Sequence, residues 1–378
     1  MLLNELNNVS NNGLFDFVAF CSSGLEGAVA LELKKFGYKV YYSSSGRIFF
    51  KARVEDIPFL NLYMKTADRI SLLIKRFKAE TFDELFDNVK SSNLSELVEK
   101  NAKIVVDKLK ITNSKLSATG AVASVLKKAI VENLGGTNES GPVYSFVLVL
   151  KDDEAFLLLD TSGDALSKRG YRLKTSKAPL RETIAAAIVV LSRWDFESSA
   201  PLFDTFCGSG TIPIEAATLN LPNISRRYIS EEWKILKEHW EKVKKRSLGE
   251  LRQLSKKLTQ AFIHGSDIDC QVIKVAQENM KRASQIFQTK LPIKFSCTDF
   301  RDLATFNGKA WIISNLPYGE RLDDKNVIEG VKILREKFPN GNFYLLHADK
   351  DFEKLFGKAR KKIRFQNSGI WTYLFMYY

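Results

Sequence analysis

The chain has 378 residues, 45% of them hydrophobic and 27% charged, which is the balance of an ordinary globular protein with two or three domains. No run of eighteen uncharged apolar residues occurs, and the N-terminus lacks the basic start and apolar stretch of a signal peptide, so we expect neither a membrane span nor export. The four cysteines and three histidines show no metal-ligand spacing. We therefore expect no disulfide framework, no metal and a cytoplasmic location.

Positive charge is concentrated in the second half of the chain. The 57 Lys and Arg residues exceed the 44 Asp and Glu residues, which gives a net charge of +13. Residues 1–175 hold 24 basic and 21 acidic residues, so +10 of the excess lies in residues 176–378. A cationic surface gains affinity for nucleic acids by releasing counterions from the phosphate backbone. This predicts a phosphate-rich partner. The alternative is a lysine-rich surface that reflects genomic composition or a hot habitat.

The first 75 residues have the pattern of a small split βαβ unit. A strand, a helix and two strands joined by a serine-glycine turn are expected within residues 15–50. A helix at about 54–67 and a strand at 70–77 follow. This order is typical of a ferredoxin-like fold.

A second α+β module is expected from residue 76 to residue 165. A strand is expected at 102–109 and a helix at 122–133, and two strands follow around a turn at 151–154. The glycine-bearing, basic stretch 161–175 has the composition of a linker.

Strands and helices alternate in the second half. The stretches with strand character are 201–207, 261–267, 293–300 and 311–313, and helical stretches between or before them are 180–194, 210–220 and 270–283. This alternation predicts a parallel, doubly wound α/β sheet. Ligands of such sheets bind just beyond the carboxyl ends of the strands, so the residues there are the candidates for a site.

The first of these strand ends carries a glycine-rich turn, DTFCGSGT, from Asp204 to Thr211. Gly208 and Gly210 allow a tight turn and a close approach to a ligand, and the following helix start offers unpaired N–H groups. No Lys-Ser/Thr pair follows, so the turn is not a phosphate loop. The dinucleotide fingerprint is also incomplete, because Pro213 stands in place of its third glycine. The alternative is a strand-helix turn without a ligand.

The second strand ends in Asp267, after a charged helical insertion at about 221–260. A carboxylate at this position can accept hydrogen bonds from both hydroxyls of a ribose. Its neighbour Asp269 is expected to cap the next helix. The alternative is that Asp267 is also only a helix cap.

The third strand runs into Asp299 and Phe300. The carboxylate can accept a hydrogen bond from the exocyclic amine of adenine, and the phenyl ring can lie against the base. The alternative is a solvated strand end. Together with the glycines and Asp267, these residues describe an adenosine pocket without a phosphate clamp.

The fourth strand ends in the tetrapeptide Asn315-Leu316-Pro317-Tyr318. An exocyclic amine of a purine is a poor nucleophile because its lone pair is delocalised into the ring. The Asn315 side-chain oxygen and the Leu316 carbonyl can accept its two N–H groups and turn the lone pair toward a methyl donor. Pro317 stiffens the turn, and Tyr318 can stack on a base swung out of its helix. The alternative is a surface β-turn.

A nucleoside pocket beside Asn-Leu-Pro-Tyr resembles the S-adenosylmethionine-dependent amino-methyltransferases. The chain also contains GLEGAVALELKKFGY in its first half, and KRGYR, APLRETIAAAIV, FCGSGTIPIEAA and RRYISEEW in its second. In this ordered set of motifs, residues 15–372 resemble the THUMP-containing ribosomal-RNA guanine-N2 methyltransferases of bacteria.

The resemblance implies a Rossmann-like α/β methyltransferase domain preceded by α+β modules. A ferredoxin-like segment at 1–75 and a THUMP RNA-binding domain at 76–165 would be joined by a linker at 166–180 to the methyltransferase domain at 181–378. The insertion at about 221–260 would form a basic flap.

The resemblance also implies S-adenosyl-L-methionine as the cofactor and RNA as the partner. Catalysis would fall to Asn315, Leu316, Pro317 and Tyr318. The cofactor-binding residues carried over are Arg181, Glu182 and Thr183 near the methionine end, and Asp204, Cys207, Gly208, Gly210, Asp267, Ile268, Asp299 and Phe300.

Three alternatives to a 23S ribosomal RNA substrate stay open. Leu316 stands where the ribosomal enzymes usually have proline and is common in tRNA guanine-N2 enzymes, so tRNA is the first. A DNA adenine-N6 methyltransferase is the second, because the same tetrapeptide suits an adenine amine, although the N-terminal module argues against it. The third is a non-catalytic RNA-binding assembly factor with a methyltransferase shell.

Overall fold

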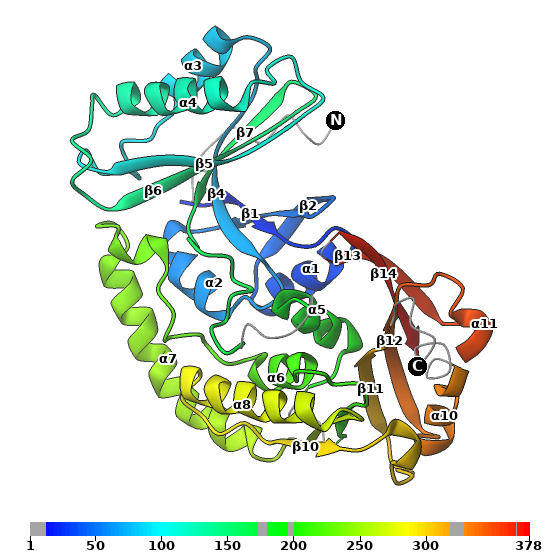
Figure 1. Ribbon diagram of the computed structural model, residues 1–378. Coiled ribbons are helices and arrows are strands. Elements are labelled where there is room, and N and C mark those ends of the chain that lie inside the picture. The colour runs from blue at the N-terminus through cyan, green and yellow to red at the C-terminus, as the bar shows by residue number, and fades with distance from the viewer. Residues whose placement is uncertain (1–12, 173–179, 196–199, 318–328, 368) are drawn as a thin grey trace.

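The computed structural model describes residues 13–172, 180–195, 200–317, 329–367 and 369–378. Two sheets of seven strands each organise the chain, one in each half (Figure 1). Among the helices of the described ranges, none is long and apolar enough to cross a membrane.

The N-terminal sheet joins the strands of both expected α+β modules. Its order is β2-β3-β1-β4-β7-β6-β5, and β5 and β6 are its parallel pair. Strand β4 pairs with β1 on one side and with β7 on the other, so it links the two modules in one hydrogen-bonded network. The strands are β1 (Phe15–Phe20), β2 (Lys39–Ser44), β3 (Arg47–Ala52), β4 (Arg69–Lys78), β5 (Lys103–Thr112), β6 (Val143–Lys151) and β7 (Glu154–Asp160).

Helices pack on one face of this sheet. Val29 of α1 and Leu126 of α4 share one buried cluster with Phe17 of β1. Side chains alternate between the two faces of a strand, so the intervening residues point to the opposite face. The helices are α1 (Glu26–Lys35), α2 (Ile57–Tyr63), α3 (Phe82–Lys90) and α4 (Thr119–Asn133), with a 3₁₀ turn at η1 (Val54–Asp56).

The opposite face carries a smaller buried cluster whose members all come from strands. They are Val18, Phe49, Leu73, Val147, Val149 and Leu158, with Phe20 and Phe156 packed beside them. No helix of the described ranges contributes to this buried cluster, and we call this face of the N-terminal sheet the open face.

The C-terminal sheet has the order β10-β9-β8-β11-β12-β14-β13. The five strands from β10 to β12 are parallel, which confirms the predicted doubly wound sheet, and β13 and β14 add an antiparallel hairpin at one edge. The strands are β8 (Leu202–Asp204), β9 (Ile263–Asp267), β10 (Ile293–Cys297), β11 (Ala310–Asn315), β12 (Gly341–His347), β13 (Lys361–Asn367) and β14 (Ile370–Tyr377).

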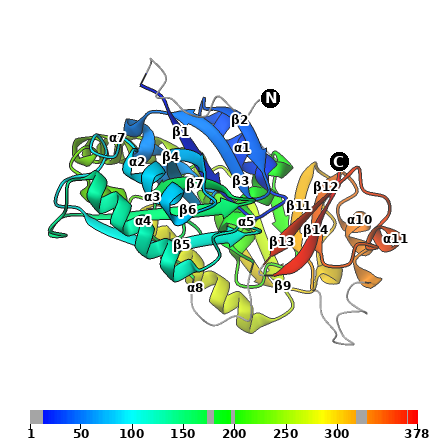
Figure 2. The same ribbon diagram turned by 90° about the horizontal axis from the view of Figure 1, so that it is seen from above.

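Helices cover this second sheet on both faces. Ile313 of β11 belongs to one buried cluster and its neighbour Ile312 to another, as expected for a strand buried on both sides. Figure 2 shows α10 and α11 at the side of the molecule opposite to α7. The helices are α5 (Glu182–Ser192), α6 (Thr211–Thr218), α7 (Lys237–Leu258), α8 (Cys270–Ile286), α10 (Ile333–Lys337) and α11 (Glu353–Phe356), with 3₁₀ turns at η2 (Ile229–Glu232) and η3 (Phe300–Asp302).

The insertion at 221–260 connects the two halves. Trp233 is buried and stacks on Tyr144 of β6, with ring centroids 4.5 Å apart, and its indole N–H donates to the Val143 carbonyl at 3.0 Å. Leu258, at the end of α7, lies instead in the core of the C-terminal sheet. The segment therefore buries apolar surface against the N-terminal half through its aromatic side chains, while its role as a basic flap stays a prediction.

Two further contacts hold the halves together. Helix α5 is apolar on nearly all sides and buried, and Ala28 of α1 packs in the same cluster as Ala185 of α5. At the other contact, the backbone N–H of Gln366 in β13 donates to the Ser23 carbonyl at 3.3 Å. Gly24, at φ +98°, leaves no room for a Cβ atom against this hairpin.

Candidate active site

Three parallel strands end in polar side chains at one edge of the C-terminal sheet. Strand β8 ends in Asp204, β9 in Asp267 and β11 in Asn315. The fourth, β10, ends at Cys297, two residues before Asp299. This is the edge at which a doubly wound sheet binds ligands, and the sequence predicted these residues for it.

The glycine-rich turn between β8 and α6 is tied to β9. The Cys207 N–H donates to the Ser266 carbonyl and the Gly208 N–H to an oxygen of Asp267, each at 2.9 Å. Gly208 (φ +50°) and Gly210 (φ +82°) both have the left-handed backbone that favours glycine. A Cβ atom on Gly210 would lie 2.8 Å from the Phe295 ring, whereas one on Gly208 would point into open space. The turn therefore leaves room above Gly208.

Asp267 keeps acceptor capacity for a ligand. Its second oxygen accepts the Asp269 N–H at 3.1 Å, so each oxygen has one partner of the two or so that a carboxylate oxygen can take. Burial raises its pKa, and these two backbone bonds oppose the shift. Asp269 caps α8 by accepting from Gln271 and Val272, which confirms that prediction. Ile268 beside it is 67% exposed, an apolar surface next to the carboxylate.

Asp204 is a buried carboxyl group below the glycine turn. Burial raises its pKa to about 8, and the Ser314 hydroxyl and the Phe206 N–H oppose the shift by hydrogen bonding to it. Ser314 also accepts the Thr205 N–H at 2.9 Å, so it ties β8 to β11. The sequence analysis missed Ser314, although a serine inside an apolar strand next to Asn315 is a signal.

The Asn315 side-chain oxygen is buried and has no hydrogen-bond partner among the described residues. An unpaired buried acceptor costs about 1–3 kcal/mol, so a site that holds one is shaped for a donor that arrives with a ligand. Leu316 is buried, and its N–H donates to the Leu346 carbonyl of β12 at 3.1 Å, which fixes the turn after β11. Pro317 is half-buried, and Tyr318 lies outside the described residues.

Asp299 caps the turn η3 and is engaged by Arg301. The carboxylate accepts from the Arg301 N–H at 2.8 Å and from its guanidinium, which holds the pKa of Asp299 below its usual range. The Arg301 guanidinium is about half exposed to solvent. An adenine amine that binds Asp299 would therefore displace a partner that water can solvate. Phe300 is buried against Phe206, with ring centroids 4.8 Å apart.

The three residues at the start of α5 that were carried over as cofactor-binding residues have two different sets of hydrogen-bond partners. Arg181 donates to Asp68 at 3.2 Å and Thr183 donates to the same carboxylate at 2.6 Å, so their described partner belongs to the N-terminal half. Glu182 instead pairs with Arg172 at 2.8 Å, and that guanidinium also donates to Thr211 at the start of α6. Of the three, Glu182 is the one that the structure connects to the glycine turn.

Cys270 and Cys297 are joined by a disulfide between the Asp267 and Asp299 segments, with their Cα atoms 5.0 Å apart. The sequence analysis expected no disulfide framework and did not predict this bond. The 27-residue separation carried no signal, because the two cysteines meet only through the parallel pairing of β9 and β10, which sets Cys297 opposite Asp267. The other two, Cys21 and Cys207, are free.

The hydrogen-bonding groups at this edge of the sheet fit S-adenosyl-L-methionine. Its hydroxyls, adenine amine and ammonium group are donors, and Asp204, Asp267 and Asp299 are acceptors at three successive strand ends. The turn from Asp204 to Thr211 contains no Lys or Arg to hold a phosphate. Within the described ranges, no group of three or more His, Cys, Asp or Glu residues is placed to hold a metal ion.

Comparison with known sequences and structures agrees with this geometry. The chain is 35% identical over 381 residues to the Bacillus subtilis (strain 168) protein named "Putative RNA methyltransferase YpsC", with 96% of each chain covered. It is 29% identical to "Ribosomal RNA large subunit methyltransferase K/L" of Colwellia psychrerythraea, over 96% of this chain and 52% of that protein. The chain thus spans about half the length of the K/L relatives.

A solved structure supports the same relationship. The chain resembles the crystal structure of "SMU.472, a putative methyltransferase complexed with SAH", at 31% identity and a TM-score of 0.84, with 97% of this chain and 98% of that chain covered. Residues 16–71 match the RlmL ferredoxin-like domain, and residues 169–370 match the RMKL-like methyltransferase domain. By these matches and by the site at its sheet edge, the chain belongs to the RMKL-like methyltransferase family.

Proposed function

We propose that the protein is an S-adenosyl-L-methionine-dependent RNA methyltransferase that methylates the exocyclic N2 amine of a guanosine, in 23S ribosomal RNA. The observation that carries the proposal is the buried side-chain oxygen of Asn315 at the carboxyl end of β11, which has no hydrogen-bond partner within the described ranges. An amine N–H is the kind of donor that this oxygen lacks.

The residues of the tetrapeptide would align the amine. The Asn315 oxygen accepts one N–H and the Leu316 carbonyl the other, which directs the nitrogen lone pair to one side. Leu316 is held in place by its bond to Leu346, so the two acceptors stay at the end of β11. When bound, the cofactor supplies an electrophilic methyl group on its sulfonium. The aligned nitrogen would take up this methyl group as the S–C bond breaks, S-adenosylhomocysteine would be the leaving thioether, and the amine proton would pass to solvent water.

The acids at the neighbouring strand ends would hold the cofactor. Asp267 accepts the ribose hydroxyls with the acceptor capacity that its two backbone bonds leave free, and Ile268 offers an apolar surface to the adenine. Asp204 ends β8 directly before the glycine turn and would be the acceptor for the ammonium group. Because its pKa is raised to about 8, this pairing would require the carboxyl group to lose its proton when the cofactor binds. Rate acceleration then comes mainly from holding two reactants in line.

The choice of RNA rests on the N-terminal half and on the relatives. Residues 16–71 match a domain that also occurs in RlmL, and the relatives named above carry RNA and ribosomal RNA methyltransferase names. Such a substrate would place the enzyme in the cytoplasm. Leu316 in the tetrapeptide favours tRNA as the second candidate.

Nucleoside mass spectrometry tests the proposal. Ribosomal RNA, tRNA and DNA are incubated separately with the protein and isotopically labelled S-adenosylmethionine and then digested. Label in N2-methylguanosine from 23S RNA is expected, and label in the same nucleoside from tRNA alone would move the second candidate ahead. Label in N6-methyladenine of DNA, or no label in any pool although the cofactor binds, would overturn the proposal.

A further inference from the structure

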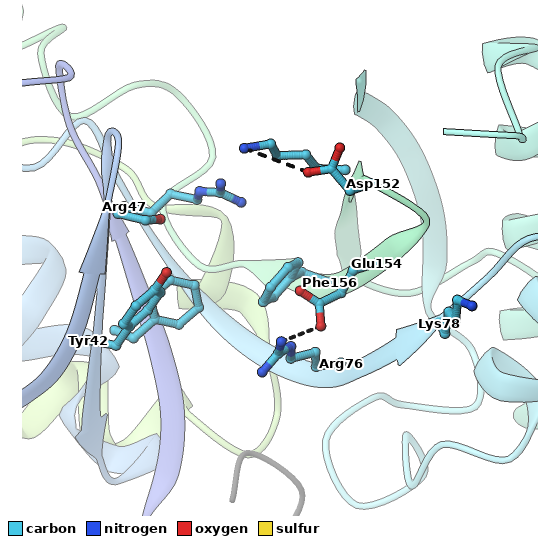
Figure 3. Close-up of a pocket in the computed structure, with 10 residues that line it drawn as sticks. Tyr42, Arg47, Arg76, Lys78, Asp152, Glu154 and Phe156 are labelled. Carbon is cyan, nitrogen blue, oxygen red and sulfur yellow. Dashed lines mark ion pairs between the residues drawn. The ribbon is translucent and has the colours of Figure 1, made fainter. Parts of the chain in front are cut away.

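The open face of the N-terminal sheet contains a hollow lined by cations and aromatic rings. This sheet hollow, of 440 Å³, is lined by Tyr42, Arg47, Arg76 and Phe156 among others. Figure 3 shows Tyr42 and Arg47 on one side, Lys78 on the other, and Phe156 between them. The guanidinium groups of Arg47 and Arg76 lie 5.7 and 5.5 Å from the centre of the Phe156 ring. Cations and rings together are what a nucleic acid strand requires.

Arg47 is a half-buried cation without an ion pair among the described residues. Burial lowers its pKa, and the nearby Tyr42 and Glu154 oppose this shift. Glu154 itself is paired with Arg76. A half-buried guanidinium that no carboxylate engages is a ready partner for an anion from outside the chain.

Arg47 also lines a second hollow, of 640 Å³, between the two halves. This hairpin hollow is further lined by Lys110 of β5, Arg181 of α5 and Trp371 of β14. Lys110 is exposed and, in the described part of the chain, also lacks an ion pair. The two hollows therefore share Arg47 and lie next to each other, one on the open face and one beside the β13–β14 hairpin. We call the two together the path.

Trp371 offers a ring face to this path. It is 44% exposed, and the Arg364 guanidinium lies 3.9 Å from the centre of its ring. Arg364 covers one face of the indole, so the other face can accept a base. Base–aromatic stacking tolerates any sequence because every base has a π-face.

The path ends at the edge that holds Asn315. In the C-terminal sheet, Asn315 lies opposite Leu346, and Leu346 lies opposite Leu374 of β14. Asn315 is therefore two strand spacings, each about 4.8 Å, from Leu374. Trp371 comes three residues before Leu374 and lies beyond the same edge of the sheet, since β14 runs antiparallel to β12.

We infer that a single-stranded segment of the RNA substrate runs along this path, with phosphates on Arg47 and Lys110 and a base on Trp371, and thereby delivers the target guanosine to Asn315. The inference rests on the proposed function and adds the route by which the substrate binds. It places the strand on the open face and the hairpin rather than on the lysine-rich outer side of α7.

A single strand fits better than a duplex or a protein. Stacking on Trp371 requires unstacked bases, which a duplex does not offer. Five cations line the two hollows besides Arg181 (Arg47, Arg76, Lys78, Lys110 and Lys151). Arg76, Lys78 and Lys151 each pair with a carboxylate, as Arg181 does, whereas Arg47 and Lys110 have no ion pair among the described residues and are left for the phosphates of a strand.

The experiment measures binding of a fluorescein-labelled oligouridine to the full chain by anisotropy at several salt concentrations. The path variants are Arg47→Glu with Lys110→Glu, and Trp371→Ala. The control is Lys245→Glu with Lys256→Glu, which makes the same charge change on exposed lysines of α7. Arg47→Gln is added in case the charge reversal prevents folding. Calorimetry with S-adenosylhomocysteine checks that each variant keeps its cofactor affinity.

The path variants are expected to bind oligouridine about ten-fold more weakly or worse, while the control changes little. The slope of log K against log salt concentration should also become shallower by about 0.7 for each phosphate that the charge variants no longer neutralise. If the α7 control binds more weakly and the path variants keep their affinity, or if the wild type binds duplex DNA better than oligouridine, the inference is overturned.

The design separates this inference from the proposed function. Oligouridine binding involves no methyl transfer, so path variants that no longer bind it would support the path even if no RNA were methylated. Methylated guanosine from the wild type, together with unchanged oligouridine binding by the path variants, would overturn the path alone.

Discussion

The two seven-stranded sheets use their surfaces in opposite ways. The N-terminal sheet buries one face under helices and leaves cations and rings on the other, whereas the C-terminal sheet is buried on both faces and presents its carboxyl edge. A face suits an extended strand that needs many weak contacts. An edge suits a compact ligand, since several strand ends converge on one point.

The half of the chain with the higher net charge is not the half that supplies most cations of the inferred RNA path. The excess of basic residues is +3 in residues 1–175 and +10 in the remainder. The path that we infer nevertheless has most of its cations in the first half, from β3, β4 and β5. On this inference, the placement of cations that lack an ion pair among the described residues, here Arg47 and Lys110, is a better guide to an anion site than the charge of a whole domain.

The connection between the two sheets gives the largest expected effect. Trp233→Ala should lower the free energy of unfolding by about 3–5 kcal/mol, because it removes a buried ring that stacks on Tyr144. Urea unfolding followed by circular dichroism measures it. The exposed Trp371→Ala is the matched control, with an expected change near 0.5 kcal/mol or less. Equal destabilisation of the two variants would show that the segment before α7 does not join the halves.

Asn315→Ala tests whether the carboxyl edge of the C-terminal sheet aligns the amine for methyl transfer. Turnover should fall about 100-fold or more because one of the two acceptors that align the amine is removed, while the affinity for S-adenosylhomocysteine stays unchanged. Asn342→Ala is the control, since Asn342 lies on the adjacent strand β12 at the opposite edge of the sheet. A variant that keeps its turnover, or whose cofactor affinity falls to the same extent, would be incompatible with an aligning role.

Asp204→Asn tests the electrostatics under the glycine turn. The folded-state pKa of Asp204 is about 8 and its ordinary value is 3.8, so between these values the folded state binds the extra proton. Wild-type stability should therefore fall as pH rises from about 4 to 8 through this group, and Asn removes that fall. The advantage of the variant should grow by up to about 1.4 kcal/mol per pH unit. Parallel stability curves from pH 5 to 8, measured without cofactor, would refute the raised pKa.

The C-terminal sheet and its edge were largely predictable from the sequence. Each of the strands that end in Asp204, Asp267 and Asn315 is followed by a turn or a helix, and this order along the chain suffices to place the three strand ends at one edge. Asp269 as a helix cap was equally local. What the side chains bind at this edge stays a prediction, as do the domain boundaries.

The features that could not be predicted all depend on contacts between distant segments. The pairing of β4 with β7 merges two modules into one sheet, and the local pattern of either strand is the same whether or not they pair. Arg181 and Thr183 meet Asp68 only because α5 packs beside the N-terminal half. Trp233 lies in a charged stretch that has the composition of a solvated helix.

The most direct test of the division between face and edge measures two affinities on two variants. Arg47→Glu with Lys110→Glu should weaken oligouridine binding and leave S-adenosylhomocysteine binding intact. Asp267→Asn should do the reverse, because it weakens an acceptor for the ribose hydroxyls at the edge and leaves the open face unchanged. Opposite effects in the two variants would support separate sites for RNA and cofactor. A fall in both affinities in either variant would contradict that division.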